Sequence, residues 1–261
     1  MGFLSSFVEN MCFKPDSQQY WKPEHYALRS IPFSASGSQE RRIDGVVIPA
    51  QAVDGVRRPQ TVVYFEPGIC NREFNLPQAV HLAAGGFDLI VFDYSGFGIS
   101  PGTPSIDGLL ADAEAVFEWL DASSFKKPKY VLFGQGLGAD AALQYCHAHP
   151  GKVEKLILES AYADRRAWLK ERWGPVIGDI AARVLPCAAI EPEDALQTVK
   201  MPTLLIYPEK DTFVRGGQRK RMTSNLRKNV TVWAVPGARH LRVFTNPNAL
   251  WSKKLREFIA R

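Results

Sequence analysis

The stretch Phe133-Gly134-Gln135-Gly136-Leu137-Gly138-Ala139 decides the fold of this 261-residue chain. The apolar run 129–133 before the turn predicts a buried strand. After the turn, apolar side chains recur at helical spacing and predict a helix with one buried face; they are Leu137, Ala141, Ala142, Leu143 and Tyr145. A glycine-rich turn from a buried strand into a helix is typical of α/β proteins with a mostly parallel sheet.

The turn has the spacing of a nucleophile elbow, Gly-x-Ser-x-Gly, with glycine in place of serine. In an elbow the nucleophile sits on a sharp strand-to-helix turn, and small residues on either side let the backbone fold back. Gly134 and Gly138 supply those small residues, and Gly136 occupies the nucleophile position. The turn alone is weak evidence, because nucleotide-binding folds use similar glycine-rich turns.

Two later segments supply candidates for an acid and a base. The strand predicted over 203–207 leads into a loop that contains Asp211, and the strand predicted over 230–235 leads into Pro236-Gly237-Ala238-Arg239-His240. A carboxylate that accepts the Nδ1 proton of a histidine fixes its tautomer and steadies the imidazolium formed during catalysis. Asp211 is therefore the candidate acid and His240 the candidate base.

With these motifs, residues from about 60 to 260 resemble the α/β-hydrolase superfamily, in its small-capped serine-hydrolase form. The resemblance implies a mostly parallel twisted sheet flanked by helices, in a single domain over 1–261. It also implies hydrolysis of an ester, thioester or amide through an acyl-enzyme, without metal or cofactor. Acyl esters are the expected substrates. The segment Asp93-Tyr94-Ser95-Gly96 also resembles the superfamily and is interpreted as scaffold.

The same resemblance places an oxyanion hole between the elbow and the end of the strand predicted over 61–65. Such a hole needs two backbone amides aimed at the oxygen of the tetrahedral intermediate. Leu137 and Ile69 are the expected donors, with Gly68 as the alternative to Ile69, since Pro67 has no N–H. Glu66 and Pro67 stand where the superfamily usually carries His-Gly.

A small helical cap is expected over 162–199, between the strands predicted over 155–159 and 203–207. This segment is too long for a single connection, and its apolar residues recur at helical spacing until Gly174-Pro175 interrupts them. Two interpretations stay open. Aromatic residues such as Trp168 and Trp173 line an acyl-binding pocket, or they pack against the rest of the domain, which their spacing favours.

The chain carries 32 Lys and Arg against 27 Asp and Glu, a formal net charge of +5. Many cations fall in the expected cap and rim, namely Arg165, Arg166, Lys170, Arg172, Arg215, Arg219, Lys220, Arg221, Arg239 and Arg242. They fit either an anionic substrate or surface, or an ordinary solvated face. Interspersed acids and the lack of an aromatic-basic pattern argue against a nucleic-acid partner.

Four scattered cysteines without metal spacing predict reduced thiols and a cytoplasmic protein. No run approaches the roughly 18 apolar residues of a membrane span. Met1-Gly2 formally fits an acylation signal, and the apolar segment 3–13 follows it. Packing of that segment on the sheet is the favoured interpretation, contact with a membrane surface stays open, and the sequence does not indicate the oligomeric state.

The glycine at 136 leaves three hypotheses. Since glycine has no side chain, no acyl-enzyme can form there, and the chain as it stands is expected to be inactive or nearly so. Either a serine was replaced on purpose, or the chain is a natural non-catalytic binding protein, or catalysis uses a water activated by His240 or the thiol of Cys70. Restoring serine is expected to lower stability, because an elbow residue with a Cβ is strained.

Overall fold

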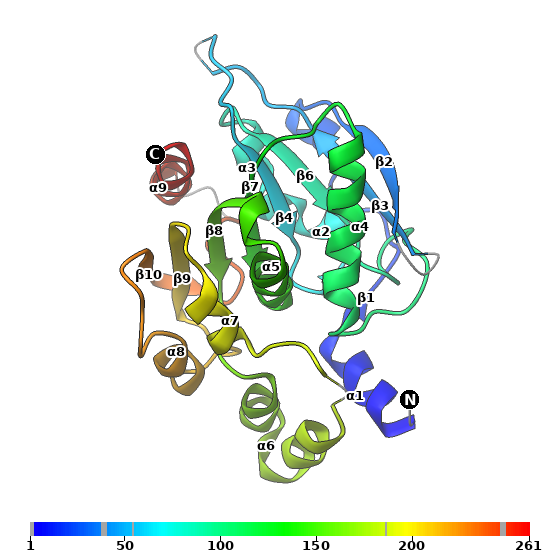
Figure 1. The fold of residues 1–261 in the computed structure, drawn as a ribbon, viewed down its shortest axis with the longest axis vertical. Helices are drawn as coiled ribbons and strands as arrows, with labels where there is room; N and C mark the ends of the chain where they lie inside the picture. The colour runs from blue at the N-terminus through cyan, green and yellow to red at the C-terminus, as the bar shows by residue number, and fades with distance from the viewer. Residues whose placement is uncertain (1–2, 38–40, 54, 186, 246–248) are drawn as a thin grey trace.

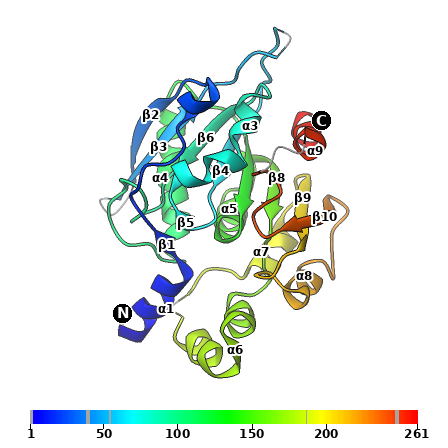
Figure 2. The same cartoon turned by 180° about the vertical axis from the view of Figure 1, so that it is seen from behind.

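The computed structural model describes residues 3–37, 41–53, 55–185, 187–245 and 249–261. Within these residues the largest sheet has eight strands, in the order β10-β9-β8-β7-β4-β6-β3-β2 (Figures 1 and 2). The strands are β2 (Ile31–Ser36), β3 (Arg42–Ile48), β4 (Thr61–Phe65), β6 (Asp88–Phe92), β7 (Tyr130–Gln135), β8 (Val153–Glu159), β9 (Thr203–Lys210) and β10 (Val230–Arg239). A second, small sheet pairs β1 (Lys14–Pro15) with β5 (Ile69–Cys70).

The six strands from β10 to β6 are parallel, whereas β3 pairs antiparallel with β6 and β2 pairs antiparallel with β3. Parallel neighbours need crossover connections, which helices supply. The expected mostly parallel sheet is therefore confirmed. The sequence also predicts a strand over 25–34, before a second one over 41–50, and the start of the first is wrong. His25 and Tyr26 belong to the 3₁₀ helix η1 (Pro23–Tyr26), and Ala27 after it has a left-handed φ of 56°, which a strand does not use.

Helices cover both faces of the sheet. Figure 1 shows α4 (Gly108–Ala122) and α5 (Leu137–Ala148) in front of it, and Figure 2, from behind, shows α3 (Val80–Ala83) on the other side. The C-terminal helix α9 (Ala249–Ala260) contacts α3. The remaining α-helices are α1 (Phe3–Cys12), α2 (Arg72–Asn75), α6 (Arg165–Val184), α7 (Pro192–Thr198) and α8 (Gly216–Met222). None of the helices within the described ranges has the length and apolar character needed to cross a bilayer.

Helical spacing of apolar residues in the sequence also predicts helices over 75–84, 216–227 and 246–260, and the first two differ from the structure. The helix predicted over 75–84 is broken into α2, the 3₁₀ helix η2 (Leu76–Gln78) and α3, because Pro77 lacks the N–H that a continuous helix needs. The helix predicted over 216–227 ends at Met222, where the Thr223 hydroxyl donates to the carbonyl of Arg219 at 2.9 Å. Residues 246–248, at the start of the helix predicted over 246–260, and Met1-Gly2 lie outside the described residues.

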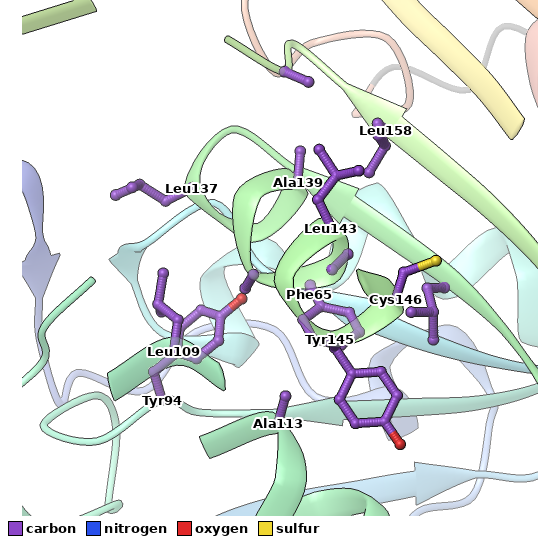
Figure 3. Packing of buried hydrophobic residues seen from close by; sticks show 14 of the residues in the cluster. Phe65, Tyr94, Leu109, Ala113, Leu137, Ala139, Leu143, Tyr145, Cys146 and Leu158 are labelled. Atoms are coloured by element: carbon purple, nitrogen blue, oxygen red, sulfur yellow. The ribbon is translucent and has the colours of Figure 1, made fainter. Parts of the chain in front are cut away.

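Successive side chains of β7 point to opposite faces of the sheet, and the buried core therefore lies in two layers. Leu132 packs under α4 and α5, whereas its neighbours Val131 and Phe133 pack on the side of α3 and α9. Figure 3 shows the first layer around α5, where Leu143 and Cys146 lie among Phe65, Leu158 and other buried side chains. This packing holds α5 against the sheet and so fixes the turn that begins it.

The segment 162–199 contains α6 and α7, which lie in different places. α7 contacts α5 and α8, whereas α6 lies apart from the sheet and beside α1 (Figure 1). α6 is kinked at Gly174, which has φ 79° and ψ 179° and precedes Pro175, where the sequence predicted an interruption. Of this segment only α6 therefore stands over the end of the sheet where β7 turns into α5.

Candidate active site

Gly136 lies between the last residue of β7 and the first residue of α5. Its backbone has φ 55° and ψ −119°, and its N–H donates to the carbonyl of Glu159 at 2.9 Å. A positive φ of this kind is costly for a residue with a Cβ and easy for glycine. The turn therefore has the sharp, strained shape that an elbow nucleophile occupies.

The three glycines of the turn differ in the space around them. A Cβ placed on Gly134 would lie 2.3 Å from the carbonyl oxygen of Gly138, and one on Gly138 would lie 2.1 Å from that of Phe65. A Cβ on Gly136 would meet nothing closer than the Cβ of Pro67, at 3.5 Å, which is ordinary contact. Close packing therefore requires the two flanking glycines, whereas a serine side chain has room at 136.

Asp211 and His240 lie within hydrogen-bond distance, with 2.9 Å between the Asp211 Oδ2 and the His240 Nδ1. Three other donors reach the carboxylate: Ser160 Oγ at 2.7 Å, and the amides of Phe213 and Val214, both at 2.9 Å. Burial acts to raise the pKa of Asp211, but the hydrogen bonds and the attraction of His240 outweigh it and hold this pKa below its usual value. Because an ionised carboxylate only accepts, Nδ1 carries the proton and Nε2 is free to act as a base.

Contacts on the neighbouring loops fix the orientation of His240. Its ring stacks on Phe213, with centroids 4.6 Å apart and planes 18° apart. The guanidinium of Arg172, from α6, lies 4.3 Å from the centroid of the same phenyl ring. The carbonyl of the next residue, Leu241, accepts a hydrogen bond from Gln78 Nε2 at 2.6 Å. The imidazole is thus held by its ring face and by the backbone that follows it.

The residues expected to form the oxyanion hole lie beside Gly136. Leu137 is the first residue of α5, and first-turn amides have no partner inside a helix. Ile69 and Leu137 line the same cavity as Gly136. Gly68 has φ 75°, and a Cβ placed on it would lie 2.9 Å from the Leu137 Cδ1. The structure therefore brings Leu137, Ile69 and Gly68 together, and their role as donors stays a prediction.

Glu66, which replaces the usual histidine, is buried and points into the scaffold. Its Oε2 accepts from Asn75 Nδ2 at 2.9 Å, and the same amide nitrogen donates to the carbonyl of Ile69 at 2.7 Å. Burial, and next the charge of Asp93, raise the pKa of Glu66 well above its usual value. Glu66 therefore helps to hold the turn after β4 through Asn75.

Sequence reasoning did not identify Glu159, the last residue of β8, or Ser160, which follows it. Ser160 is fully buried in the left-handed region, with φ 54°, and its hydroxyl holds Asp211. Glu159 Oε2 accepts from Gln135 Nε2 at 2.5 Å, and burial raises the pKa of Glu159 to about 8. The strand order offered one signal for these residues. β8 lies between β7, which leads to Gly136, and β9, which leads to Asp211, and the carboxyl ends of parallel strands meet at one edge of the sheet.

Two cavities meet at His240. The smaller, of about 220 Å³, contains Gly136 and Leu137 and lies under Trp168 and Trp173 of α6. The larger, of about 910 Å³, also contains His240 and carries Lys210, Arg239 and Arg242 in its wall. Both are lined by Ile69, Phe213, His240 and Leu241. His240 thus lines both a compact cavity, whose wall carries Trp168 and Trp173 together with the cations Lys14 and Arg172, and a wider cleft.

The cysteines do not offer a nucleophile here. Cys70 is not among the described residues that line either cavity, and burial raises the pKa of its thiol. Cys12 does line the smaller cavity, but burial, and next the charge of Glu9, raise its pKa to about 12. A neutral thiol is a poor nucleophile. The described residues also contain no group of three or more His, Cys, Asp and Glu side chains placed to hold a metal ion.

Comparisons with known proteins agree with this geometry. The pattern of the family described as serine aminopeptidase, S33 matches residues 58–197, more than half of the chain. The protein YfhR of Escherichia coli K12 is 24% identical over 254 residues, which cover 96% of this chain and 86% of YfhR. Protein bem46 of Schizosaccharomyces pombe is 29% identical over 158 residues, 59% of this chain and 52% of bem46. The Pyrococcus furiosus esterase Pf2001 has the same fold, with a TM-score of 0.75 and 18% identity over 94% of this chain and 98% of the esterase.

Proposed function

Since the chain belongs to the serine aminopeptidase S33 family of α/β-hydrolases, we propose that its site is built for acyl esters or thioesters and that Gly136 leaves it inactive or nearly so. One observation carries the proposal. The oriented pair Asp211–His240 faces a cavity that contains an elbow of the right backbone shape, and this elbow lacks only a hydroxyl. Esterases among the structural neighbours support small esters as ligands.

Each group of the site has a defined task in that chemistry. With serine at 136, His240 Nε2 would take the hydroxyl proton while the oxygen attacks the ester carbonyl carbon, and Asp211 would stabilise the imidazolium. The amides of Leu137 and Ile69 would hold the oxygen that becomes negative. With glycine, no covalent intermediate forms, and only the slow attack of a water near His240 is left.

In this proposal α6 is the cap of the acyl cavity. Trp168 and Trp173 line that cavity, and the Trp168 Nε1 donates to the carbonyl of Phe213 at 3.1 Å, in the loop that stacks on His240. Leu169 of the same helix is buried, whereas Val176 and Ile177 are more than half exposed. Contact with the cavity thus comes from the first half of α6, before the kink. We also place the protein in the cytoplasm, with support from its four free cysteines.

The test compares the chain with its Gly136→Ser and Gly136→Ala variants on p-nitrophenyl butyrate and with a fluorophosphonate probe. We expect labelling and at least about a 10³-fold faster turnover in Gly136→Ser alone, because subtilisin-type sites lose that much or more without their nucleophile. Gly136→Ala carries the same backbone change without the hydroxyl. Adding His240→Ala to Gly136→Ser is expected to abolish the gain.

A second candidate function is ligand or protein binding by a naturally non-catalytic member of the family. The observation in its favour is Glu66-Pro67, which replaces the usual His-Gly and ties the turn to Asn75. If Gly136→Ser stays folded but is silent towards both the ester and the probe, the oxyanion segment is not competent and the binding function is favoured.

A further inference from the structure

The larger cavity beside His240 is lined by cations and by no acid. Lys210, Arg239 and Arg242 contribute to its wall, and no Asp or Glu is among its described lining residues. Within the described part of the chain, none of the three forms an ion pair or a side-chain hydrogen bond. None of the three is therefore neutralised by a carboxylate in direct contact, although Glu209 and Asp211 flank Lys210 in the chain.

Three arginines elsewhere in the chain are neutralised by carboxylates. Arg165 binds Asp140, Arg72 binds Asp93 and Arg41 binds Asp112. Those pairs join one element to another and serve the fold. The three cations of the larger cavity form no such pair between elements. A cleft lined by charges of one sign attracts a ligand of the opposite sign.

The chain places these cations at fixed positions around the base. Lys210 precedes the acid Asp211, Arg239 precedes the base His240, and Arg242 follows it by two residues. Both loops are held, one by the hydrogen bonds to Asp211 and the other by Gln78. An anion in the larger cavity is therefore kept close to the reacting ester bond.

The wall across from these loops is aromatic. Trp21, Tyr26 and Phe74 line the same cavity and are 51%, 36% and 39% exposed. Aromatic rings beside cations suit an organic group that carries a negative charge, because a bare inorganic ion would leave the rings in contact with water. The cavity thus fits an anionic organic group of some size.

The position of His240 divides an ester between the two cavities. The carbonyl of a bound ester must lie at Gly136 and His240. The acyl chain and the alcohol part, the two arms of the ester, must therefore extend from there in different directions. A cavity of about 150 Å³ accommodates benzene, so the smaller one, of about 220 Å³ under α6, has room for a short acyl chain against Trp168 and Trp173. Two cations, Lys14 and Arg172, also line it, and the guanidinium of Arg172 lies over the ring of Phe213. The alcohol part then falls in the cationic cleft of about 910 Å³.

We infer that the ligand of this site is a short-chain acyl ester whose alcohol part carries a phosphate, bound by Lys210, Arg239 and Arg242. The inference rests on the proposed function, which supplies the ester. It adds the class of alcohol and assigns each arm of the ester to one cavity.

The experiment uses two ligands that differ only in the phosphate, hexanoyl glycerol 3-phosphate and hexanoyl glycerol, and titrates each into the chain with Gly136, which leaves the ester intact. Calorimetry should show about tenfold tighter binding of the phosphate ester at low salt, and a smaller advantage at about 0.5 M salt. Lys210→Gln and Arg242→Gln should each weaken binding of the phosphate ester by up to about fivefold, and the affinity for the neutral ester should stay the same.

The matched controls are Arg58→Gln and Lys253→Gln, which remove one charge each from a different groove, the one between the loop before β4 and α9. They should leave the ratio of the two affinities unchanged. If they lower it as much as Lys210→Gln does, the effect belongs to the net charge and the inference fails. Equal binding of the two esters also overturns it while the proposed function stands, whereas no binding of either ester overturns both.

A further arm separates an ester from a free phosphate compound. Glycerol 3-phosphate should bind at least about tenfold more weakly than its hexanoyl ester, because it has no acyl chain to fill the smaller cavity. Equal affinity would mean that the cleft binds the phosphate alone, and the division of one ligand between the two cavities would then be wrong.

Discussion

At Gly136 the backbone conformation and the available space make opposite demands. The φ of 55° favours glycine, whereas the surroundings leave room for a side chain, with Pro67 Cβ 3.5 Å from a placed Cβ. At Gly134 and Gly138 both the space and the close backbone approach demand glycine. Of the three glycines in the turn, Gly136 is therefore the one at which a side chain can be introduced with backbone strain as the only cost.

We expect Gly136→Ser and Gly136→Ala to lower the free energy of unfolding by similar amounts, about 1 to 3 kcal/mol, because both place a Cβ in the strained region. Urea unfolding measures this. Gly134→Ala and Gly138→Ala serve as comparison variants and should lose more, since each new Cβ meets a backbone oxygen. A Gly136→Ser protein more stable than the parent chain would contradict the elbow conformation described here.

Glu159 should make stability depend on pH near neutrality. Its pKa is about 8 in the folded chain and 4.5 when unperturbed, because burial, the largest cause, disfavours the charged form. Between these values the folded state keeps a proton that the unfolded state has released, so stability falls as the pH rises from about 4.5 to 8. The full effect amounts to about 5 kcal/mol, since each pKa unit corresponds to about 1.4 kcal/mol.

Glu159→Gln removes this titration. The free energy of unfolding of the variant minus that of the parent chain should therefore increase by about 2 to 4 kcal/mol from pH 5 to pH 8. Urea unfolding of both proteins at both pH values measures this difference. Asp211 does not interfere, because its lowered pKa moves its titration below 3.8. Parallel pH profiles of variant and parent would show that Glu159 is ionised in the folded state.

Between elements, a buried ion pair ties α6 to α5. Arg165, the first residue of α6, binds Asp140 in the first turn of α5, with Nε–Oδ2 at 2.7 Å and Nη2–Oδ1 at 2.6 Å. The Tyr162 hydroxyl donates to the same carboxylate at 2.6 Å. Both charged side chains are 1% exposed. The helix whose Trp168 and Trp173 line the smaller cavity is thus anchored one turn beyond Gly136.

We expect Arg165→Met to cost about 3 to 5 kcal/mol, because it leaves the charge of Asp140 buried without its partner. The double variant Arg165→Met/Asp140→Leu should lose less than the single one, since it buries no charge. Urea unfolding of both single variants and the double variant forms the required cycle. Additive losses would mean that the two side chains act independently.

Across the whole molecule, stability should be lowest where α6 lies. All six residues of β7 are buried, whereas Val176, Ile177 and Ile180 of α6 are 70%, 59% and 53% exposed. We expect the amides of 176–184 to exchange hydrogen faster than those of β7, because local opening there exposes little apolar surface. Hexanoyl glycerol should slow exchange in 165–173, which lines the cavity. Equal protection of α6 and β7 would show that they open together.

The sequence predicted the order of elements better than their ends. Continuous apolar runs such as 61–65 and 203–207 identified β4 and β9, because strands buried on both faces carry few polar residues. The broken helix at Pro77 was missed, since helical spacing persists on both sides of the break. Contacts such as Gln78 with Leu241 join residues 163 positions apart and leave no local signal.

For the site, residue type and chain order selected Gly136, Asp211 and His240, because each follows a predicted strand of the parallel sheet. Ser160 was missed, as serine after a strand is common and its bond to Asp211 depends on a left-handed backbone that the sequence does not reveal. The role of Glu66 also needed the structure, since only burial beside Asn75 shows where its carboxyl points.

By itself the sequence determined the fold family, the parallel sheet and the missing hydroxyl, because apolar periodicity and glycine spacing are local properties of the chain. Only the tertiary structure decided that Asp211 and His240 lie 2.9 Å apart, that Gly136 has room for a side chain, and that His240 lines two cavities, the larger of which carries Lys210, Arg239 and Arg242. These features arise where the ends of β4, β7, β8, β9 and β10 meet. Distances there depend on how the strands and helices pack, which no single stretch of sequence contains.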